Sequence, residues 1–218
     1  MVNKELIIFD MDGTLVNSST TIANAINYVR QQLGFEPMDT TYILSKVNDH
    51  TVNPAQIFYH AKTFQHDHER WFSEYYTKYH NKELVLYEGI KALLESLRHK
   101  GFKLAIATNA YRRSTIESLT YLNIYTYFDA ITCYDDVRKG KPYPDMLLKL
   151  LNGLNISKEK TLFIGDGPRD EQAAKHAGID YIMVDWGFTE HTEKKGVVTS
   201  VEILSKYLCS THKDKYME

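Results

Sequence analysis

From residue 87 onward, short apolar runs typical of β-strands alternate with longer segments typical of amphipathic helices. This alternation predicts a parallel sheet with helices on both faces. An earlier apolar run at residues 6–9 fits the same pattern, although a long tract without clear strand signals separates it from the others. We therefore expect an α/β protein in which an all-helical segment is inserted after the first strand. The expected strands are 6–9, 103–107, 130–133, 161–164 and 181–184, and the expected core helices are 88–100, 112–121, 144–151 and 169–177.

The inserted tract is predicted to be helical. Its first segment places apolar side chains on one helical face, with Ser18 or Ser19 as a cap and Gly34 as a C-terminal stop. Aromatic side chains at helical spacing follow, and we expect them to form the core of a small bundle rather than a platform for stacking bases. These aromatic residues are Phe58, Phe64, Trp71, Phe72, Tyr75, Tyr76 and Tyr79. The expected helices are 18–33, 40–47, 54–64 and 66–79, and the expected parts are a core of residues 1–16 and 84–218 and an insertion of residues 17–83.

Composition excludes several classes of function. The chain has 218 residues, and its 26 basic and 28 acidic residues are interspersed. Without a basic face to offset phosphate charge, binding to nucleic acid is not expected. Cys133 and Cys209 lie far apart in the sequence, so neither a disulfide scaffold nor a zinc site is expected. No segment approaches the roughly 20 apolar residues of a membrane helix, and we expect a cytoplasmic protein without a membrane partner.

The first strand ends in two carboxylates. Asp10 and Asp12 follow the apolar run directly, and Gly13 and Thr14 come next. Open α/β sheets bind ligands in the crevice beyond the carboxyl ends of their strands. Gly13 permits a positive φ, and the Thr14 hydroxyl can tie the loop to its own backbone. These residues are therefore candidates for a reaction in which one carboxylate attacks and the other moves protons.

Three later segments bring further polar residues to the expected strand ends. Thr108 and Asn109 follow one strand, Lys141 lies in a Gly-Lys-Pro segment, and Asp166 and Asp170 follow another strand. Parallel strands bring these ends to one edge of the sheet. Carboxylates gathered there repel one another unless a cation offsets them, and an all-oxygen set suits Mg²⁺. The sequence therefore predicts a phosphate site beside a magnesium ion held between Asp10, Asp12 and Asp166.

Each group can be given a chemical role. The Asp10 carboxylate can attack phosphorus, and Asp12 can protonate the leaving alcohol and later deprotonate water. The Thr108 hydroxyl and the Lys141 ammonium can hold phosphoryl oxygens. Taken singly, Thr108 can be a helix cap, Lys141 a surface lysine, and Asp170 an acid favoured by a helix dipole. Their joint occurrence after successive strands favours the catalytic interpretation.

These motifs resemble those of the haloacid dehalogenase superfamily, in the phosphatase branch with a helical cap that includes phosphoglycolate phosphatases and β-phosphoglucomutase-like proteins. The resemblance covers essentially the whole chain, although the cap matches only in length and helicity. It implies a Rossmann-like sheet with the first strand central and a mobile cap that closes over substrate. The matching segments are DMDGTL at 10–15, the strand that ends in Thr108-Asn109, GKPYPD at 140–145 and the acidic motif at 165–170.

The resemblance also implies roles for the site residues. Asp10 would be the nucleophile and Asp12 the acid/base. Asp170 would support the metal site through water or through Lys141. The implied phosphate-binding residues are Thr108, Asn109 and Lys141, and the implied magnesium ligands are Asp10, the Asp12 carbonyl and Asp166.

The expected function is Mg²⁺-dependent hydrolysis of a small phosphorylated metabolite, such as phosphoglycolate or a sugar phosphate, through an aspartyl phosphate. Asp12 argues against a dehalogenase, because that reaction has no leaving alcohol to protonate. The alternatives are a β-phosphoglucomutase-like phosphomutase and a non-catalytic binding module of the same fold. A phosphonate hydrolase would need a Schiff-base lysine, for which the insertion offers Lys46, although an exposed helix surface is the simpler interpretation. The resemblance allows a monomer or a homodimer.

Two further sets of residues are candidates for contact with the substrate. Lys46, Asn48 and His50 in the insertion can bind a polar or anionic tail, although exposed loop polarity is the favoured explanation. Tyr111, like Arg112 and Arg113, follows the Thr108 motif and can reach the same tail. Arg112 and Arg113 come next, and they are as readily explained as surface charges at the start of a helix.

Overall fold

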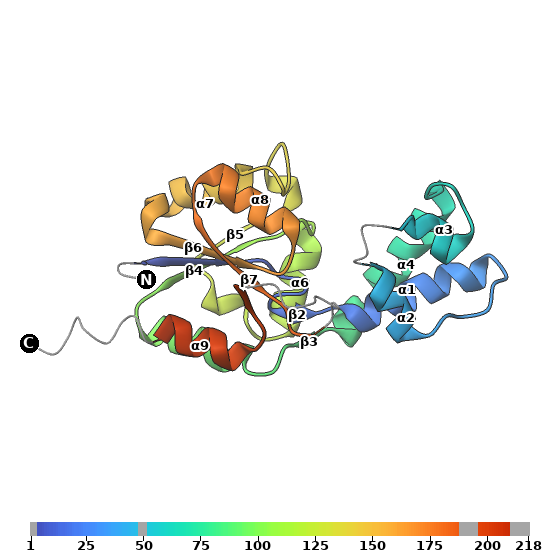
Figure 1. Cartoon of the computed structure of the whole chain (residues 1–218), viewed down its shortest axis with the longest axis horizontal. Helices are drawn as coiled ribbons and strands as arrows, with labels where there is room; N and C mark the ends of the chain where they lie inside the picture. Colours follow the sequence, from blue (N-terminus) through green and yellow to red (C-terminus); the bar gives the residue numbers. More distant parts are fainter. Residues whose placement is uncertain (1–3, 48–51, 188–195, 210–218) are drawn as a thin grey trace, which may run out of the picture. The chain divides into compact units, whose positions relative to one another are not determined.

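The structure is a computed structural model, and it describes residues 4–47, 52–187 and 196–209 (Figure 1). By its internal contacts the chain divides into two compact units. The first unit, the core, contains the amino-terminal strand and most of the second half of the chain, and the second, the helical unit, contains the helices between them. The core consists of Met1–Val16, Leu86–Trp186 and Glu193–Glu218, and the helical unit of Asn17–Val85 and Gly187–Thr192.

The core is built on a parallel sheet in the order β5-β4-β1-β6-β7-β8. Strand β1 (Leu6–Phe9) lies between β4 (Lys103–Ala107) and β6 (Thr161–Gly165). The chain order reverses on either side of β1, so the carboxyl end of this strand opens at a topological switch point. This confirms the expected α/β class and the central place of the first strand. The remaining strands are β5 (Ala130–Thr132), β7 (Asp180–Val184) and β8 (Val197–Val198).

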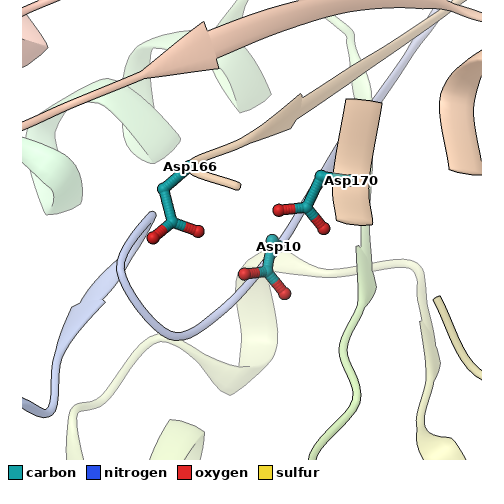
Figure 2. A group of neighbouring side chains, drawn as sticks. All are labelled: Asp10, Asp166 and Asp170. Carbon is teal, nitrogen blue, oxygen red and sulfur yellow. The ribbon is translucent and has the colours of Figure 1, made fainter. Parts of the chain in front are cut away.

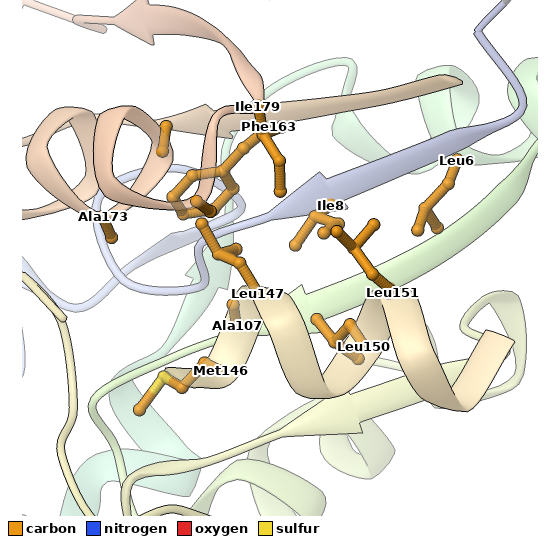
Figure 3. Close-up of a cluster of buried hydrophobic side chains, with 13 residues drawn as sticks. Leu6, Ile8, Ala107, Met146, Leu147, Leu150, Leu151, Phe163, Ala173 and Ile179 are labelled. Carbon is orange, nitrogen blue, oxygen red and sulfur yellow. The ribbon is translucent and has the colours of Figure 1, made fainter. Parts of the chain in front are cut away.

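The central strands are buried on both faces, as their continuous apolar runs predict. On one face, Leu6, Ile8 and Phe163 pack against Leu147 of α7 and Ala173 of α8 (Figure 3). On the other face, α9 packs against α5 and lies opposite α7 and α8 (Figure 1). The core helices are α5 (Ile90–His99), α6 (Arg112–Tyr121), α7 (Asp145–Leu154), α8 (Pro168–Ala177) and α9 (Val201–Cys209), with short 3-10 helices at Tyr125–Tyr127, Tyr134–Asp136 and Lys158–Lys160.

Two short strands lie where the chain passes between its two units. Strand β2 (Val16–Asn17) pairs with β3 (Val85–Leu86) in a separate two-stranded sheet. The sequence indicated connecting segments at these places but no strands, because a strand of two residues shows no periodicity.

The helical unit has its own apolar core. Ile26 and Val29 of α1 (Ser19–Gln32) pack with Ile43 and Phe58 from the following helices. The expected helix 54–64 is wrong beyond Tyr59, because His60 adopts a left-handed conformation with φ of 55° and ends the helix. Phe64 is 47% exposed and therefore does not belong to this core. The other helices are α2 (Thr40–Val47), α3 (Pro54–Tyr59) and α4 (His66–Glu83).

A search of the described helices for a membrane span, by length and hydropathy, finds none.

Candidate active site

The loop after β1 is tightly folded. The Asp10 amide donates a hydrogen bond of 2.8 Å to the Ile164 carbonyl of β6, so Asp10 remains part of the sheet. The chain then turns back at once, because the amides of Leu15 and Val16 both bond the Met11 carbonyl at 2.9 Å. These hydrogen bonds place Asp10 at the carboxyl end of the central strand β1 and fix the backbone before and after it.

Gly13 allows this loop to approach Asp166. It has a φ of +80°, and a Cβ atom built there would lie 2.1 Å from Asp166 Oδ2. The Asp166 carboxylate therefore occupies the space that a side chain at position 13 would need. Glycine is required here for both its backbone conformation and its lack of a side chain.

We expect Gly13→Ala to lower kcat/KM by about 100-fold or more, because the added methyl group must displace the Asp166 carboxylate. Gly101→Ala is a matched control: Gly101 has a φ of +82°, but nothing lies within 4 Å of the place that its Cβ would take. Both variants should lose stability from backbone strain, roughly 1–2 kcal/mol. Steady-state kinetics and urea unfolding check this, and equal activity in the two variants would contradict it.

Three carboxylates gather at the carboxyl edge of the sheet. One oxygen from each of Asp10, Asp166 and Asp170 lies within 4.8 Å of the others, and Figure 2 shows the three side chains around one space. Asp10 follows β1, Asp166 follows β6, and Asp170 lies in the first turn of α8. The structure thus brings together Asp10, from the first motif, with Asp166 and Asp170, which belong to one acidic motif far along the chain.

Lys141 lies among these carboxylates. Its Nζ is 2.5 Å from Asp10 Oδ1 and 2.6 Å from Asp170 Oδ1, and the side chain is only 5% exposed. Burial disfavours the charged ammonium, but the two carboxylates outweigh it and raise the pKa of Lys141 above its usual value. Lys141 is therefore a permanent cation at the centre of the site.

One lysine does not neutralise three carboxylates. Burial is the largest influence on the pKa of Asp10, which lies well above its ordinary value despite the opposing effect of Lys141. Burial, and then the charge of Asp170, raise the pKa of Asp166 to about 7. The donor set is made of carboxylate oxygens and carries excess negative charge, so it fits a hard divalent cation. Within the described parts of the chain, the carboxylates close enough together to hold it are those of Asp10, Asp166 and Asp170, the last of which the resemblance had given a supporting role.

A pH dependence follows from these pKa values. The folded-state pKa of Asp166 is above its unfolded value, so its contribution to the stability of the metal-free protein is present below about pH 4 and lost as the pH rises toward about 7. A divalent cation bound between the carboxylates would offset this loss of stability. At higher pH, protons would no longer compete with the cation for Asp166. We expect Mg²⁺ to raise Tm more at about pH 8 than at about pH 5.5. Thermal unfolding with and without Mg²⁺ checks this, and an equal or larger increase at the lower pH would contradict it.

Asn109 lies against the backbone of Lys141. Its Nδ2 donates to the Lys141 carbonyl at 3.0 Å, and its Oδ1 accepts from the Lys141 amide at 2.8 Å. The same Oδ1 would lie 2.6 Å from a Cβ built on Gly140, so the close approach depends on that glycine. The side-chain amide of Asn109 thus orients Lys141, a contact that comes in addition to the phosphate contact implied by the family resemblance.

Thr108 is almost fully buried at the end of β4. Its Oγ1 accepts a hydrogen bond of 3.0 Å from the Ala110 amide. A hydroxyl that accepts one bond keeps its own proton to donate. Thr108 therefore has the turn role, and its hydroxyl proton remains available for the donor role that the sequence predicts.

The remaining sequence candidates are Lys46, Asn48, His50, Tyr111, Arg112 and Arg113. Arg112 bonds both carboxylate oxygens of Asp136, at 2.8 and 2.5 Å, and the Ile131 carbonyl at 2.8 Å, so its guanidinium is committed within the core. Arg113 pairs with Glu117 on the helix surface, as the simpler interpretation held. Tyr111 is exposed, and Lys46 lies in the last turn of α2. Asn48 and His50 lie outside the described residues.

Sequence reasoning missed two contacts with the site loops. The Tyr181 hydroxyl donates to the Gly165 carbonyl at 2.8 Å, and the Trp186 indole donates to the Thr14 carbonyl at 2.9 Å. Both residues come from β7 or the segment just after it. The one available signal was a polar aromatic side chain on a strand next to the acidic motif, which is too common to single out a site.

Comparison with known proteins agrees with this geometry. The haloacid dehalogenase-like hydrolase family matches residues 7–184. A phosphoglycolate phosphatase from Aquifex aeolicus is 31% identical over 189 residues, which cover 85% of this chain and 86% of the relative. The pyrophosphatase PpaX of Halalkalibacterium halodurans is 29% identical over 188 residues, or 83% of each chain.

Solved structures share the fold. A haloacid dehalogenase-like family hydrolase from Streptococcus pneumoniae has a TM-score of 0.75 at 25% identity and covers 94% of this chain and 98% of its own. A protein from Haemophilus somnus has a TM-score of 0.80 at 23% identity, with 97% and 99% covered, and shows the same fold. The match over most of the chain, together with the acidic site at the end of β1, shows that this protein belongs to the haloacid dehalogenase-like hydrolases.

Proposed function

We propose that this protein is a Mg²⁺-dependent phosphatase that hydrolyses a small phosphorylated metabolite through a phosphoryl group carried on Asp10. The observation that carries the proposal is the buried Asp10 carboxylate at the switch point of the sheet, with one oxygen held 2.5 Å from Lys141 Nζ. The second oxygen of Asp10 is then the attacking atom. When bound, the divalent cation supplies charge compensation between the carboxylates and the phosphoryl group.

In the first step, an Asp10 oxygen attacks phosphorus and the bond from phosphorus to the leaving oxygen breaks. Asp12 donates a proton to that oxygen, so a phosphate ester releases its alcohol and pyrophosphate releases phosphate. Lys141 and the Thr108 hydroxyl hold phosphoryl oxygens through charge and hydrogen bonding. Asn109 serves this step indirectly, because its two hydrogen bonds fix the backbone that carries Lys141.

In the second step, a water oxygen attacks phosphorus and Asp12 takes a proton from it. The bond between phosphorus and Asp10 breaks, so phosphate leaves and the Asp10 carboxylate is restored. Dividing the reaction in this way replaces one difficult displacement with two easier ones. Asp12 returns to its acid form and is ready for the next substrate.

The relatives narrow the choice of substrate. One is named a phosphoglycolate phosphatase and another a pyrophosphatase. We therefore place phosphoglycolate and inorganic pyrophosphate first among the candidates, followed by sugar phosphates.

Release of phosphate from this panel tests the proposed function. We expect turnover of at least one substrate in the presence of Mg²⁺ and loss of that turnover when EDTA removes the metal. Release that is unaffected by EDTA would contradict the role of the cation. No release from any phosphate ester, including an aryl phosphate, would contradict the phosphatase assignment.

A further inference from the structure

Asp166 joins β6 to the start of α8. Gly165 before it pairs with Met183 of β7, and the Gly167 carbonyl after it accepts hydrogen bonds from the amides of Asp170 and Glu171 at 3.0 and 3.3 Å. Glycines stand on both sides of Asp166, Gly165 as the last residue of β6 and Gly167 as the residue before α8. Glycine is the residue with the most backbone freedom. A side chain that bonds the carbonyl groups of these glycines therefore restricts the backbone on either side of Asp166 further.

Tyr181 supplies contacts on both sides of Asp166. Its hydroxyl is 2.8 Å from the Gly165 carbonyl oxygen and 3.4 Å from that of Gly167. Gly167 also gives its amide to Asp170 Oδ2 at 3.2 Å. One hydroxyl thus reaches the carbonyl groups immediately before and after the metal-ligand candidate.

The tyrosine ring is itself held firmly. Tyr181 is the register partner of Phe163 on the neighbouring strand, and their ring centroids are 5.8 Å apart. Burial, and then the charges of Asp170, Asp166 and Asp10, raise the pKa of the Tyr181 hydroxyl well above its usual value. The hydroxyl therefore stays protonated and acts as a donor to the loop.

We propose that Tyr181 is a positioning residue that fixes the loop of residues 165–167 and thereby holds Asp166 in place for the cation. The inference deepens the metal site of the proposed function and rests on it for the identity of the ion. Tyr181 acts through the backbone on either side of Asp166 and has no part in the bond changes at phosphorus.

The test is Tyr181→Phe, which keeps the ring beside Phe163 and removes the hydroxyl. Mg²⁺ is titrated into the metal-free protein without substrate and followed by calorimetry. We expect Mg²⁺ to bind about tenfold more weakly, because residues that orient a metal ligand typically contribute about 10–100-fold to affinity. At saturating Mg²⁺, kcat should stay within about threefold of wild type, since no reacting group has been removed.

Tyr127→Phe is the matched control. Its hydroxyl donates to Glu95 at 2.7 Å on the surface of the core, so its loss should leave Mg²⁺ affinity unchanged. A second variant tests the loop directly. Gly167 has a φ of −130°, and a Cβ there would lie 3.6 Å from its nearest neighbour, so Gly167→Ala is compatible with the structure. In the Tyr181→Phe background it should restore part of the lost affinity by stiffening the loop.

Equal Mg²⁺ affinity in Tyr181→Phe and wild type would overturn the inference, even if the variant had a lower Tm. Failure of the wild-type protein to bind Mg²⁺ would overturn it as well. Weaker binding in the variant, in a protein that releases no phosphate from any substrate, would support the inference while contradicting the phosphatase. The two claims can therefore fail separately.

Discussion

Asp10→Asn is expected to abolish phosphate release, lowering kcat by about 10⁴-fold or more, which corresponds to roughly 5 kcal/mol of transition-state stabilisation. The amide fills nearly the same volume, but it lacks the anionic oxygen that attacks phosphorus. Lys141 keeps its second carboxylate partner, because Asp170 Oδ1 lies 2.6 Å from its Nζ. The variant should therefore fold, and kinetics with excess enzyme measure the residual rate.

Asp67→Asn is the control for this change. Asp67 lies in the first turn of α4, where its exposed carboxylate pairs with Arg70. This substitution should leave kcat unchanged and stability nearly so, because exposed pairs contribute little. Turnover in Asp10→Asn within tenfold of wild type, with the fold verified by circular dichroism, would contradict a nucleophilic Asp10.

Lys141→Met is expected to damage both activity and stability. The methionine keeps an apolar stem but leaves Asp10 and Asp170 facing each other without the ammonium between them. Removing one partner of a buried ion pair costs about 3–5 kcal/mol, and losing a charged donor to the phosphoryl group lowers kcat/KM by roughly 10³-fold. Urea unfolding and kinetics measure the two losses, and Mg²⁺ should recover part of the stability because it offsets the same carboxylates.

Lys4→Met separates the two effects. Lys4 is the other strongly buried lysine among the described residues, and its Nζ donates to the carbonyls of Glu159 and Thr161 at 2.7 and 2.8 Å. It precedes β1 and so lies at the opposite edge of the sheet from the site. This variant should lose stability and keep kcat/KM. If Lys4→Met and Lys141→Met lost the same fraction of activity, the assignment of Lys141 to the phosphoryl group would be contradicted.

Much of the fold follows from sequence patterns alone. The strand Lys103–Ala107 and the helices Thr40–Val47 and Arg112–Tyr121 have the predicted bounds, because apolar runs and helical periodicity mark them clearly. Strand β8 and helix α9 were missed. A two-residue strand carries no alternation, and a nine-residue amphipathic segment near the end of the chain gives a weak signal.

The candidate site, like the fold, could be predicted from the sequence only in part. Asp10, Asp166 and Lys141 stand in motifs with characteristic neighbours, so the sequence predicted them as candidates, and the structure brings their side chains together. Contacts between distant segments carry no such signal. Asn109 bonds a backbone 32 positions away, and nothing in its motif predicts this contact. Tyr181 reaches the acidic loop only because β7 lies beside β6 in the sheet.

The central claim is that the phosphoryl group is transferred to Asp10. The most direct measurement is to trap the resulting aspartyl phosphate. In Asp12→Asn, water can no longer be deprotonated efficiently, whereas an aryl phosphate needs little protonation to leave. Mixing this variant with labelled p-nitrophenyl phosphate and Mg²⁺ should therefore give a burst of nitrophenol that matches the amount of protein. Acid quenching and peptide mapping should place the label on Asp10. Nitrophenol release without a burst and without label on Asp10, in a protein that still turns over, would contradict the account.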